Sequence, residues 1–376
     1  IDRDTIEPGS RAAANLVGID QQDLERGVLL ARPGSITMSG RFLAQLNFPP
    51  RSGGEVADRG AYHVHLGTAS VSARIRALTD TETPAVMITA TTPVPVMMGD
   101  RFILRDTGRR AVIAGGTVLD PSPTRKPTPC DVATLANAAR LSPDRRADAL
   151  VAVHGSITAA EVDRASGGGN PSGAISVGAR HLSEDVFARR GRELQSAVKE
   201  YHERYPLRPG LPKSEAASRL RVDADLVTAL VEANGDLAEG GPAIHLVEFT
   251  PSLGADDVAA WEAAQELLAA DLAVPRASDL GLSAEVTHAL IRSGDLVRID
   301  DDLVLLAVQI EAIRAGLHSL PDGFTVATFR DHFGLSRRHA VPLLEWLDAE
   351  GWTRRRGNER SVSSQREGSA GDAQPR

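Results

Sequence analysis

Apolar positions near the end of the chain repeat with the spacing of an α-helix. Between residues 326 and 333 they occur at i, i+3 and i+7, and residues 340–347 repeat this spacing after a break at Gly334. Ser336 is a suitable N-cap for the second segment. The pattern predicts two short amphipathic helices joined by a tight turn, which is a helix-turn-helix.

Two strands are predicted directly after these helices. Residues 352–356 and 359–362 have strand patterns, and Gly357 and Asn358 between them suit a hairpin turn. A helix-turn-helix followed by such a hairpin is a winged helix. Pro342 falls inside the second predicted helix, where a proline costs about 3 kcal/mol. We therefore expect that helix to be kinked or to start later.

The same layout recurs upstream, with decreasing clarity. Residues 281–299 parallel residues 334–352, a weaker copy covers 214–247, and the weakest covers 145–190. Four units of about 60 residues, stacked in series, fit this span. Their expected boundaries are 132–191, 192–250, 251–307 and 308–362.

The N-terminal third has the pattern of strands instead. In residues 69–78 apolar and polar side chains alternate, and Gly and Pro turns separate similar runs with no helical pattern between them. This predicts a small barrel or sandwich. The expected strands are 41–48, 62–68, 69–78, 84–91 and 101–104, with two more at 11–16 and 28–31. We assign one barrel to 37–119, the end of another to 1–36, and a proline-rich linker to 120–131.

Composition narrows the class of protein. Of the 376 residues, 42% are hydrophobic, yet no run of about 18 apolar residues occurs, so we expect neither a membrane span nor a signal peptide. The single cysteine, Cys130, excludes an internal disulfide and favours a reducing compartment, which we take as the cytoplasm. We expect the chain to act as a monomer.

Positive charge is concentrated in the last unit, although the formal net charge of the chain is -8. A basic helix start beside a basic wing can grip a phosphate backbone, whereas the corresponding turn of the third unit, residues 300–302, is Asp-Asp-Asp. The alternative is a protein-docking module with a solvated basic face. The arginines concerned are Arg337, Arg338, Arg354, Arg355, Arg356 and Arg360.

The sequence contains no recognisable catalytic or metal-binding constellation. Residues 167–173 are glycine-rich but lack the lysine of a phosphate loop, so we expect a flexible wing loop there. His63 and His65 share a strand face, but no Cys, Asp or Glu cluster is spaced to complete a zinc site. We expect structural or RNA-facing histidines, no metal and no catalytic residue.

Two segments resemble known translation factors. Residues 8–34 and 99–121 resemble the closing strands of the second and third domains of EF-Tu-like factors. With residues 62–68, residues 205–213 and the final winged helix, the chain resembles the SelB family, the bacterial selenocysteine-specific elongation factors. The resemblance implies EF-Tu-like all-β barrels followed by a mainly α array of four winged helices. The tail, residues 363–376, has no counterpart, and we expect it to be disordered.

The resemblance also implies a function. Such a factor brings selenocysteinyl-tRNA to the ribosome and holds an mRNA hairpin (SECIS) beside a recoded UGA with its last winged helix. A GTPase domain that binds GTP and Mg²⁺ would belong to the parent protein, so this chain would have no cofactor and would not be an enzyme. A winged-helix DNA-binding transcriptional regulator remains the alternative.

Site residues follow from the same resemblance. Arg26 matches the family position lining the aminoacyl pocket, where a cation would suit an ionised selenol; a salt-bridge role is the alternative. His63 and His65 are the further aminoacyl-tRNA candidates. Arg356 stands where relatives more often place an apolar residue. The expected hairpin contacts are Arg337, Arg338, His339, Arg354, Arg355, Arg356 and Arg360.

Overall fold

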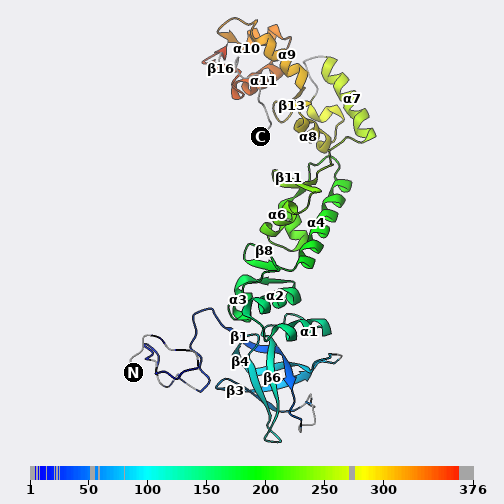
Figure 1. Cartoon of the computed structure of the whole chain (residues 1–376). Helices are drawn as coiled ribbons and strands as arrows, with labels where there is room; N and C mark the ends of the chain where they lie inside the picture. Colours follow the sequence, from blue (N-terminus) through cyan, green and yellow to red (C-terminus); the bar gives the residue numbers. More distant parts are fainter. Residues whose placement is uncertain are drawn as a thin grey trace. The chain divides into compact units, whose positions relative to one another are not determined.

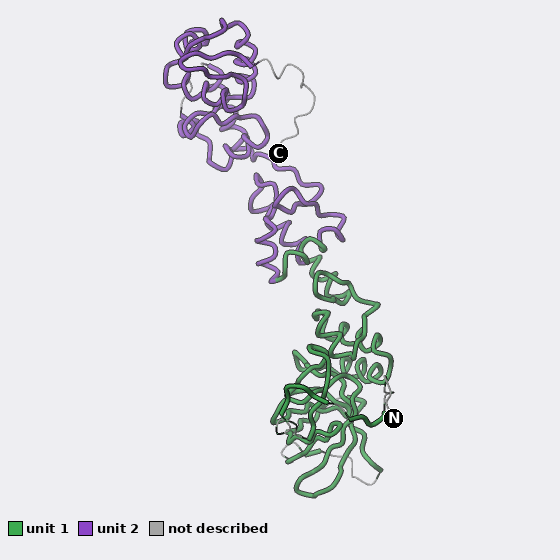
Figure 2. The backbone as a smooth tube through the Cα atoms, turned by 90° about the vertical axis from the view of Figure 1, so that its left-hand side faces the viewer, with its two compact units in different colours: residues 1–192, 222–230 green, residues 193–221, 231–376 purple. Residues whose placement is uncertain are grey.

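The computed structural model describes most of the chain in two compact units. The described residues are 5, 7, 9–13, 15–20, 22, 24, 26–50, 56–57, 60–79, 81–270 and 276–363. The first unit comprises 1–192 and 222–230, and the second comprises 193–221 and 231–376 (Figure 2). Within the described ranges, no helix has both the length and the apolar character needed to cross a bilayer.

Antiparallel strands close a barrel near the N-terminus (Figure 1). They are β1 (Thr37–Asn47), β2 (Tyr62–Leu66), β3 (Ala69–Ala77), β4 (Ala85–Val96), β5 (Arg101–Asp106) and β6 (Ala111–Asp120). Their order is β1-β4-β3-β2-β5-β6, and β6 pairs with β1 to complete the ring. In β3, Val71, Ala73 and Ile75 are buried, while the alternate residues face outward. Closure leaves no free sheet edge.

The strands predicted at 11–16 and 28–31 do not form. The described residues in both ranges have no strand assignment. Val28, Leu29 and Leu30 have 51%, 55% and 63% of their surface exposed, so the barrel does not bury them. A strand needs a neighbouring strand for its backbone hydrogen bonds, and the described residues provide none here.

The first winged helix begins immediately after the barrel. Its elements are α1 (Pro129–Ala138), α2 (Pro143–His154), β7 (Ser156–Thr158), α3 (Ala159–Ser166), β8 (Ile175–Val177) and β9 (Arg180–Leu182). Thr128 caps α1 by accepting a hydrogen bond from the Asp131 amide, so the predicted linker over 120–131 ends in a helix. Leu135 and Leu150 share one hydrophobic cluster with Leu43 and Leu119 of the barrel. The barrel and this winged helix are therefore packed together.

The glycine-rich segment 167–173 is not the flexible wing loop that the sequence predicted. It connects α3 to β8, whereas the turn between β8 and β9 contains Gly178. The Asn170 amide donates to Asp144 Oδ1 (2.9 Å), and the Ser172 amide donates to Asp148 Oδ1 (2.7 Å). These two carboxylates fix the segment against α2.

The remaining helices and strands build the other three winged helices of the predicted array. The second has α4 (Glu184–Arg204), β10 (Leu211–Pro212), α5 (Lys213–Leu220), α6 (Ala224–Glu232), β11 (Leu237–Gly240) and β12 (Ala243–Leu246). The third has α7 (Ala255–Ala270), the 3₁₀ helix η2 (Ala277–Leu280), α8 (Ala284–Ser293), β13 (Leu296–Arg298) and β14 (Val304–Leu306). The fourth has α9 (Ala307–Leu317), β15 (Phe324–Thr325), α10 (Val326–His332), α11 (Arg337–Ala349), β16 (Thr353–Arg356) and β17 (Glu359–Val362).

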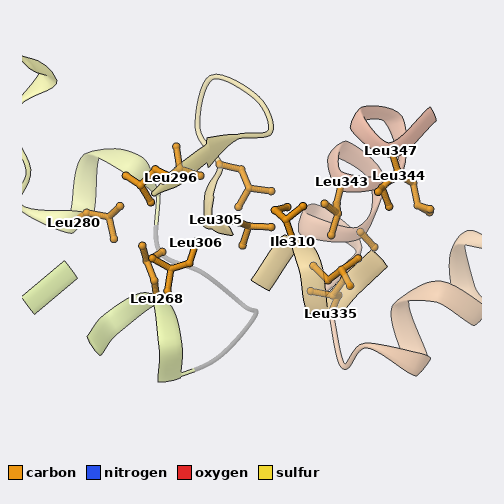
Figure 3. Close-up of a cluster of buried hydrophobic side chains, with 14 of the residues drawn as sticks. Leu268, Leu280, Leu296, Leu305, Leu306, Ile310, Leu335, Leu343, Leu344 and Leu347 are labelled. Carbon is orange, nitrogen blue, oxygen red and sulfur yellow. The ribbon is translucent and has the colours of Figure 1, made fainter. Parts of the chain in front are cut away.

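The third and fourth winged helices share one hydrophobic core. A single cluster of buried side chains runs from Leu268 and Leu296 in the third through Leu305 to Leu343 and Leu347 in the fourth (Figure 3). α9 starts directly after β14, with no linker residue between them. The third and fourth winged helices therefore form one folded body and are not two independent domains. The predicted disordered tail lies outside the described residues from position 364 onward.

Candidate nucleic-acid interface

The first turn of α11 presents positive charge to solvent. Ser336 occupies the N-cap position as predicted, and Arg337 and Arg338 follow it, both exposed. Ser336 Oγ makes no capping hydrogen bond; it lies 3.0 Å from Nδ1 of His339. The turn contains no acidic residue, so its free amides and the positive end of the helix dipole add to the two guanidinium groups.

Pro342 lies inside α11 without delaying its start. The helix runs from Arg337 to Ala349 and buries Leu343, Leu344 and Leu347. Of the two outcomes expected for this proline, a later start is therefore wrong. Because proline has no amide hydrogen, the carbonyl of Arg338 loses its usual helical donor. Burial of the leucine stripe stabilises the helix despite that loss.

The wing places its arginines on two faces. β16 pairs with β17 so that Arg355 is opposite Arg360 and Arg356 is opposite Glu359. Side chains alternate along a strand, so Arg354 and Arg356 lie on one face and Arg355 on the other. All three are exposed at the end of the hairpin. Arg355 Nε donates to the carbonyl of Gly357 in the turn (3.0 Å).

Arg360 does not belong to the exposed basic surface, which corrects the prediction that it contacts RNA. It is 4% exposed, and its Nε donates to Asp348 Oδ2 at 2.9 Å. The hydroxyl of Thr353 donates to the other oxygen of the same carboxylate, at 2.6 Å. Asp348 thus joins both strands of the wing to α11.

The other basic side chains of this tip are not neutralised. Among the described residues, no carboxylate forms an ion pair with any member of this set. We call it the basic tip; it consists of Arg337, Arg338, Arg354, Arg355 and Arg356. In a chain with a net charge of -8, such a group of free cations provides a local site for a polyanion.

The equivalent surface of the third winged helix is acidic, and its carboxylates already accept hydrogen bonds from other parts of this chain. Glu285 takes the position that Arg338 has in the fourth unit, and it accepts a hydrogen bond from Arg208 Nε at 2.8 Å. Asp300, in the acidic wing turn, accepts from the amides of Asp302 and Leu303, at 2.8 and 2.7 Å. The third unit therefore uses this face for intramolecular contacts.

A second basic region lies on the barrel, where the structure brings the three predicted aminoacyl-tRNA residues together. His63 and His65 point outward from β2 with their ring centroids 6.4 Å apart, and His63 Nε2 lies 3.1 Å from Ser72 Oγ. Burial lowers the pKa of His65, and the positive charges of Arg105, His63 and Arg26 lower it further. His65 is therefore neutral at pH 7. No carboxylate among the described residues pairs with the exposed Arg26.

Sequence reasoning missed four arginines close to these histidines. Arg101 and Arg105 point outward from β5, which pairs with β2. Arg140 and Arg146 approach from the first winged helix. Alternation along residues 101–106 was a signal for the first two, whereas the other two are brought near only by the packing of α1 and α2 on the barrel.

Metal binding finds no support in the part of the chain that the structure describes. No three His, Cys, Asp or Glu side chains there are grouped so that they could hold an ion. Cys130 is exposed near the start of α1.

Comparison with known proteins identifies the family. Residues 52–125 match the family model for the β-barrel domain of the selenocysteine-specific elongation factor, and residues 195–246 and 317–362 match two models for SelB winged helices. These matches follow one another along the chain. These three parts of the chain are SelB domains. The predicted family and fold class, barrel followed by winged helices, are thereby confirmed.

Individual SelB relatives agree with this assignment. The selenocysteine-specific elongation factor of Escherichia coli is 26% identical across 95% of this chain, and that of Desulfomicrobium baculatum is 25% identical across 94%. The chain spans 61% and 62% of the lengths of these two relatives. A crystal structure of bacterial selenocysteine-specific elongation factor EF-Sec matches 92% of this chain with a TM-score of 0.59 and 17% identity, which supports the fold.

Proposed function

We propose that this chain is the RNA-binding part of a cytoplasmic selenocysteine-specific elongation factor. Its fourth winged helix would hold an mRNA hairpin, and its barrel would contact selenocysteinyl-tRNA. The observation that carries the first assignment is the basic tip, five exposed arginines with no carboxylate partner among the described residues. The relatives that match nearly the whole chain are themselves selenocysteine-specific elongation factors.

The charge along α11 favours a folded RNA over duplex DNA. Arg338 is exposed in the first turn, but Glu345, two turns later on the same face, is exposed as well. A helix that reads DNA lies in the major groove, where Glu345 would approach phosphates. The deep groove of an RNA hairpin excludes a helix, so binding would use only the first turn and the wing against phosphates and exposed loop bases.

The barrel face suits the aminoacyl end of the tRNA. A selenol is ionised at neutral pH, and the exposed Arg26 offers a cation for it. His65, neutral for the reasons given above, can donate or accept a hydrogen bond without adding charge. We place GTP and Mg²⁺ in another part of the whole protein, because this sequence has no phosphate loop. At the ribosome, the factor would hold selenocysteinyl-tRNA and the mRNA hairpin at the same time.

The hairpin assignment is tested with the double variant Arg338→Ala/Arg355→Ala. Its two changes remove cations from the helix and the wing, so hairpin binding is expected to weaken by about 2 to 4 kcal/mol at constant salt. Fluorescence anisotropy of a labelled mRNA hairpin measures this loss.

A matched control removes two exposed arginines elsewhere. Arg41 on β1 and Arg298 on β13 are exposed and lie outside the basic tip, so Arg41→Ala/Arg298→Ala should leave hairpin affinity nearly unchanged. Duplex DNA of equal length should bind more weakly than the hairpin. If the basic-tip variant binds the hairpin as well as the unaltered chain, or if DNA binds better, the proposal is wrong.

A further inference from the structure

A groove lies where the barrel meets the first winged helix, entirely within the first compact unit. Its volume is about 800 Å³. It lies between β2, β5 and β6 on one side and the segment joining α1 to α2 on the other. We call it the junction groove; the lining residues that matter here are His65, Arg101, Gly115, Gly116, Arg140 and Arg146.

The junction groove is basic throughout. Three arginines and one histidine line it, and none of the described residues in its walls is an Asp or Glu. Arg101 and Arg140 are exposed, and neither makes an ion pair or side-chain hydrogen bond with any described residue. An acidic chain that keeps these cations unpaired in one concave place has a site suited to an anion.

Arg146 is held in place with hydrogen-bonding capacity to spare. A Cβ on Gly99 would stand 2.8 Å from its Cζ, so this glycine allows the guanidinium to pack on the barrel backbone. Nη1 makes one long contact with the carbonyl of Ser166 (3.5 Å), and Nε is buried with no partner. No ion pair joins Asp100 to Arg146. The Asp100 carboxylate accepts from the Met97 amide, and burial raises its pKa although this hydrogen bond and the nearby positive charge of Arg146 oppose the rise.

The floor of the groove lacks side chains at Gly115 and Gly116. Glycine inside a strand weakens it, so two in succession in β6 require a reason. Gly116 makes room for the ring of Phe102, since a Cβ there would lie 2.1 Å from Phe102 Cζ. Gly115 has no such constraint, because the nearest atom to its Cβ position is 4.0 Å away. It leaves bare backbone where a ligand can approach closely.

We propose that the junction groove binds the sugar-phosphate backbone of the tRNA, so that the first winged helix takes part in holding it. This rests on the proposed function and extends it from the barrel face, because His65 belongs to both regions. The lining favours phosphates over bases. The ring of Phe102, which also lines the groove, is buried with 3% of the residue exposed and offers no stacking platform.

The test uses the full chain with Arg101→Ala/Arg140→Ala. The probe is an unmodified selenocysteine tRNA transcript without an amino acid, with binding measured over a range of KCl concentrations. We expect about 10-fold weaker binding at low salt and a slope of log K against log salt that is smaller by about 1.5, since two phosphate contacts are lost. The lysine variant Arg101→Lys/Arg140→Lys should recover most of the affinity.

A crossed design separates this inference from the proposed function. The alanine variant Arg101→Ala/Arg140→Ala, called here the junction-groove variant, should bind the mRNA hairpin normally. Arg338→Ala/Arg355→Ala should bind the tRNA transcript normally. Unchanged tRNA binding by the junction-groove variant overturns the inference alone, provided that hairpin binding by the basic tip holds. The inference is also overturned if the junction-groove variant loses the same affinity for both RNAs. It is overturned as well if the unaltered chain does not bind the tRNA, or if micromolar tripolyphosphate displaces the tRNA.

Discussion

Asp348 is the residue on which the position of the wing depends. Its carboxylate accepts from Arg360 and Thr353, one in each strand of the hairpin, while its own backbone belongs to α11. The side chain of Arg360 is 5% exposed and that of Asp348 is 22% exposed. A guanidinium this deeply buried depends on its carboxylate, because an unpaired buried charge is strongly destabilising.

We predict that Asp348→Ala destabilises the wing by about 3 kcal/mol, because it leaves Arg360 buried without a counter-charge. Amide hydrogen exchange of β16 and β17 would report this as faster opening. Adding Arg360→Met removes the unpaired charge, so the double variant should exchange more slowly than Asp348→Ala alone. A double variant that opens as fast as the single one would show that the pair does not hold the wing.

Sequence patterns located the exposed arginines but not the buried one. Arg338 could be placed outward because its position relative to the leucines of the same helix is fixed by 3.6 residues per turn. Arg360 could not be placed, since its burial depends on strand register and on a carboxylate twelve positions earlier. The three aminoacyl candidates could be named from resemblance, but their proximity required the fold.

At the scale of elements, β5 and β6 show how one strand shapes another. Phe102 faces Gly116 across the pair, and its ring occupies the space that a side chain at 116 would take. Gly115, one position earlier, also lines the junction groove, but a side chain there would point to the opposite face of the strand. Packing inside the barrel thus requires glycine at position 116, whereas at position 115 glycine leaves the backbone accessible from the groove.

We predict that Gly116→Ala destabilises the barrel by about 1 to 3 kcal/mol, because the new methyl group collides with the buried ring of Phe102. Gly115→Ala is the matched control: it meets no atom closer than 4.0 Å and should be nearly neutral for stability. Thermal unfolding followed by near-ultraviolet circular dichroism would compare them. Equal melting temperatures for the two variants would contradict the assignment.

Elements were predicted where local periodicity sufficed. The predicted helices and hairpin of the last unit correspond to α10, α11, β16 and β17 within a few residues. The expected strands at 11–16 and 28–31 failed because a strand is completed by a partner that no local pattern reveals. The glycine-rich segment 167–173 failed for a similar reason, since Asp144 and Asp148 of another element fix it.

At the scale of the molecule, the shared core couples the third and fourth winged helices. Leu305 is 2% exposed and lies in the strand immediately before α9, within the cluster that continues to Leu343 and Leu347. Internal repeats in the sequence could predict four similar units, but not that two of them would bury their apolar faces against a common set of side chains.

We predict that Leu305→Ala costs about 2 to 5 kcal/mol and lowers hydrogen-exchange protection in α8 and α11 together. Leu150→Ala, in the cluster that the first winged helix shares with the barrel, is the control and should leave α11 unaffected. Mass spectrometry of peptides from both regions makes the comparison. Loss of protection confined to α8 would mean that the two units unfold independently.

The direct passage from β14 into α9 also limits how this region could be rearranged by recombination. A recombination crossover at Leu306 would divide the hydrophobic core that the third and fourth winged helices share. Each product would then expose leucine side chains to water that are buried in this chain. Insertions there would break the strand or the helix start. The third and fourth winged helices are therefore expected to be inherited, transplanted or trimmed as a pair, so that the acidic third accompanies the basic fourth even though only the fourth carries the basic tip.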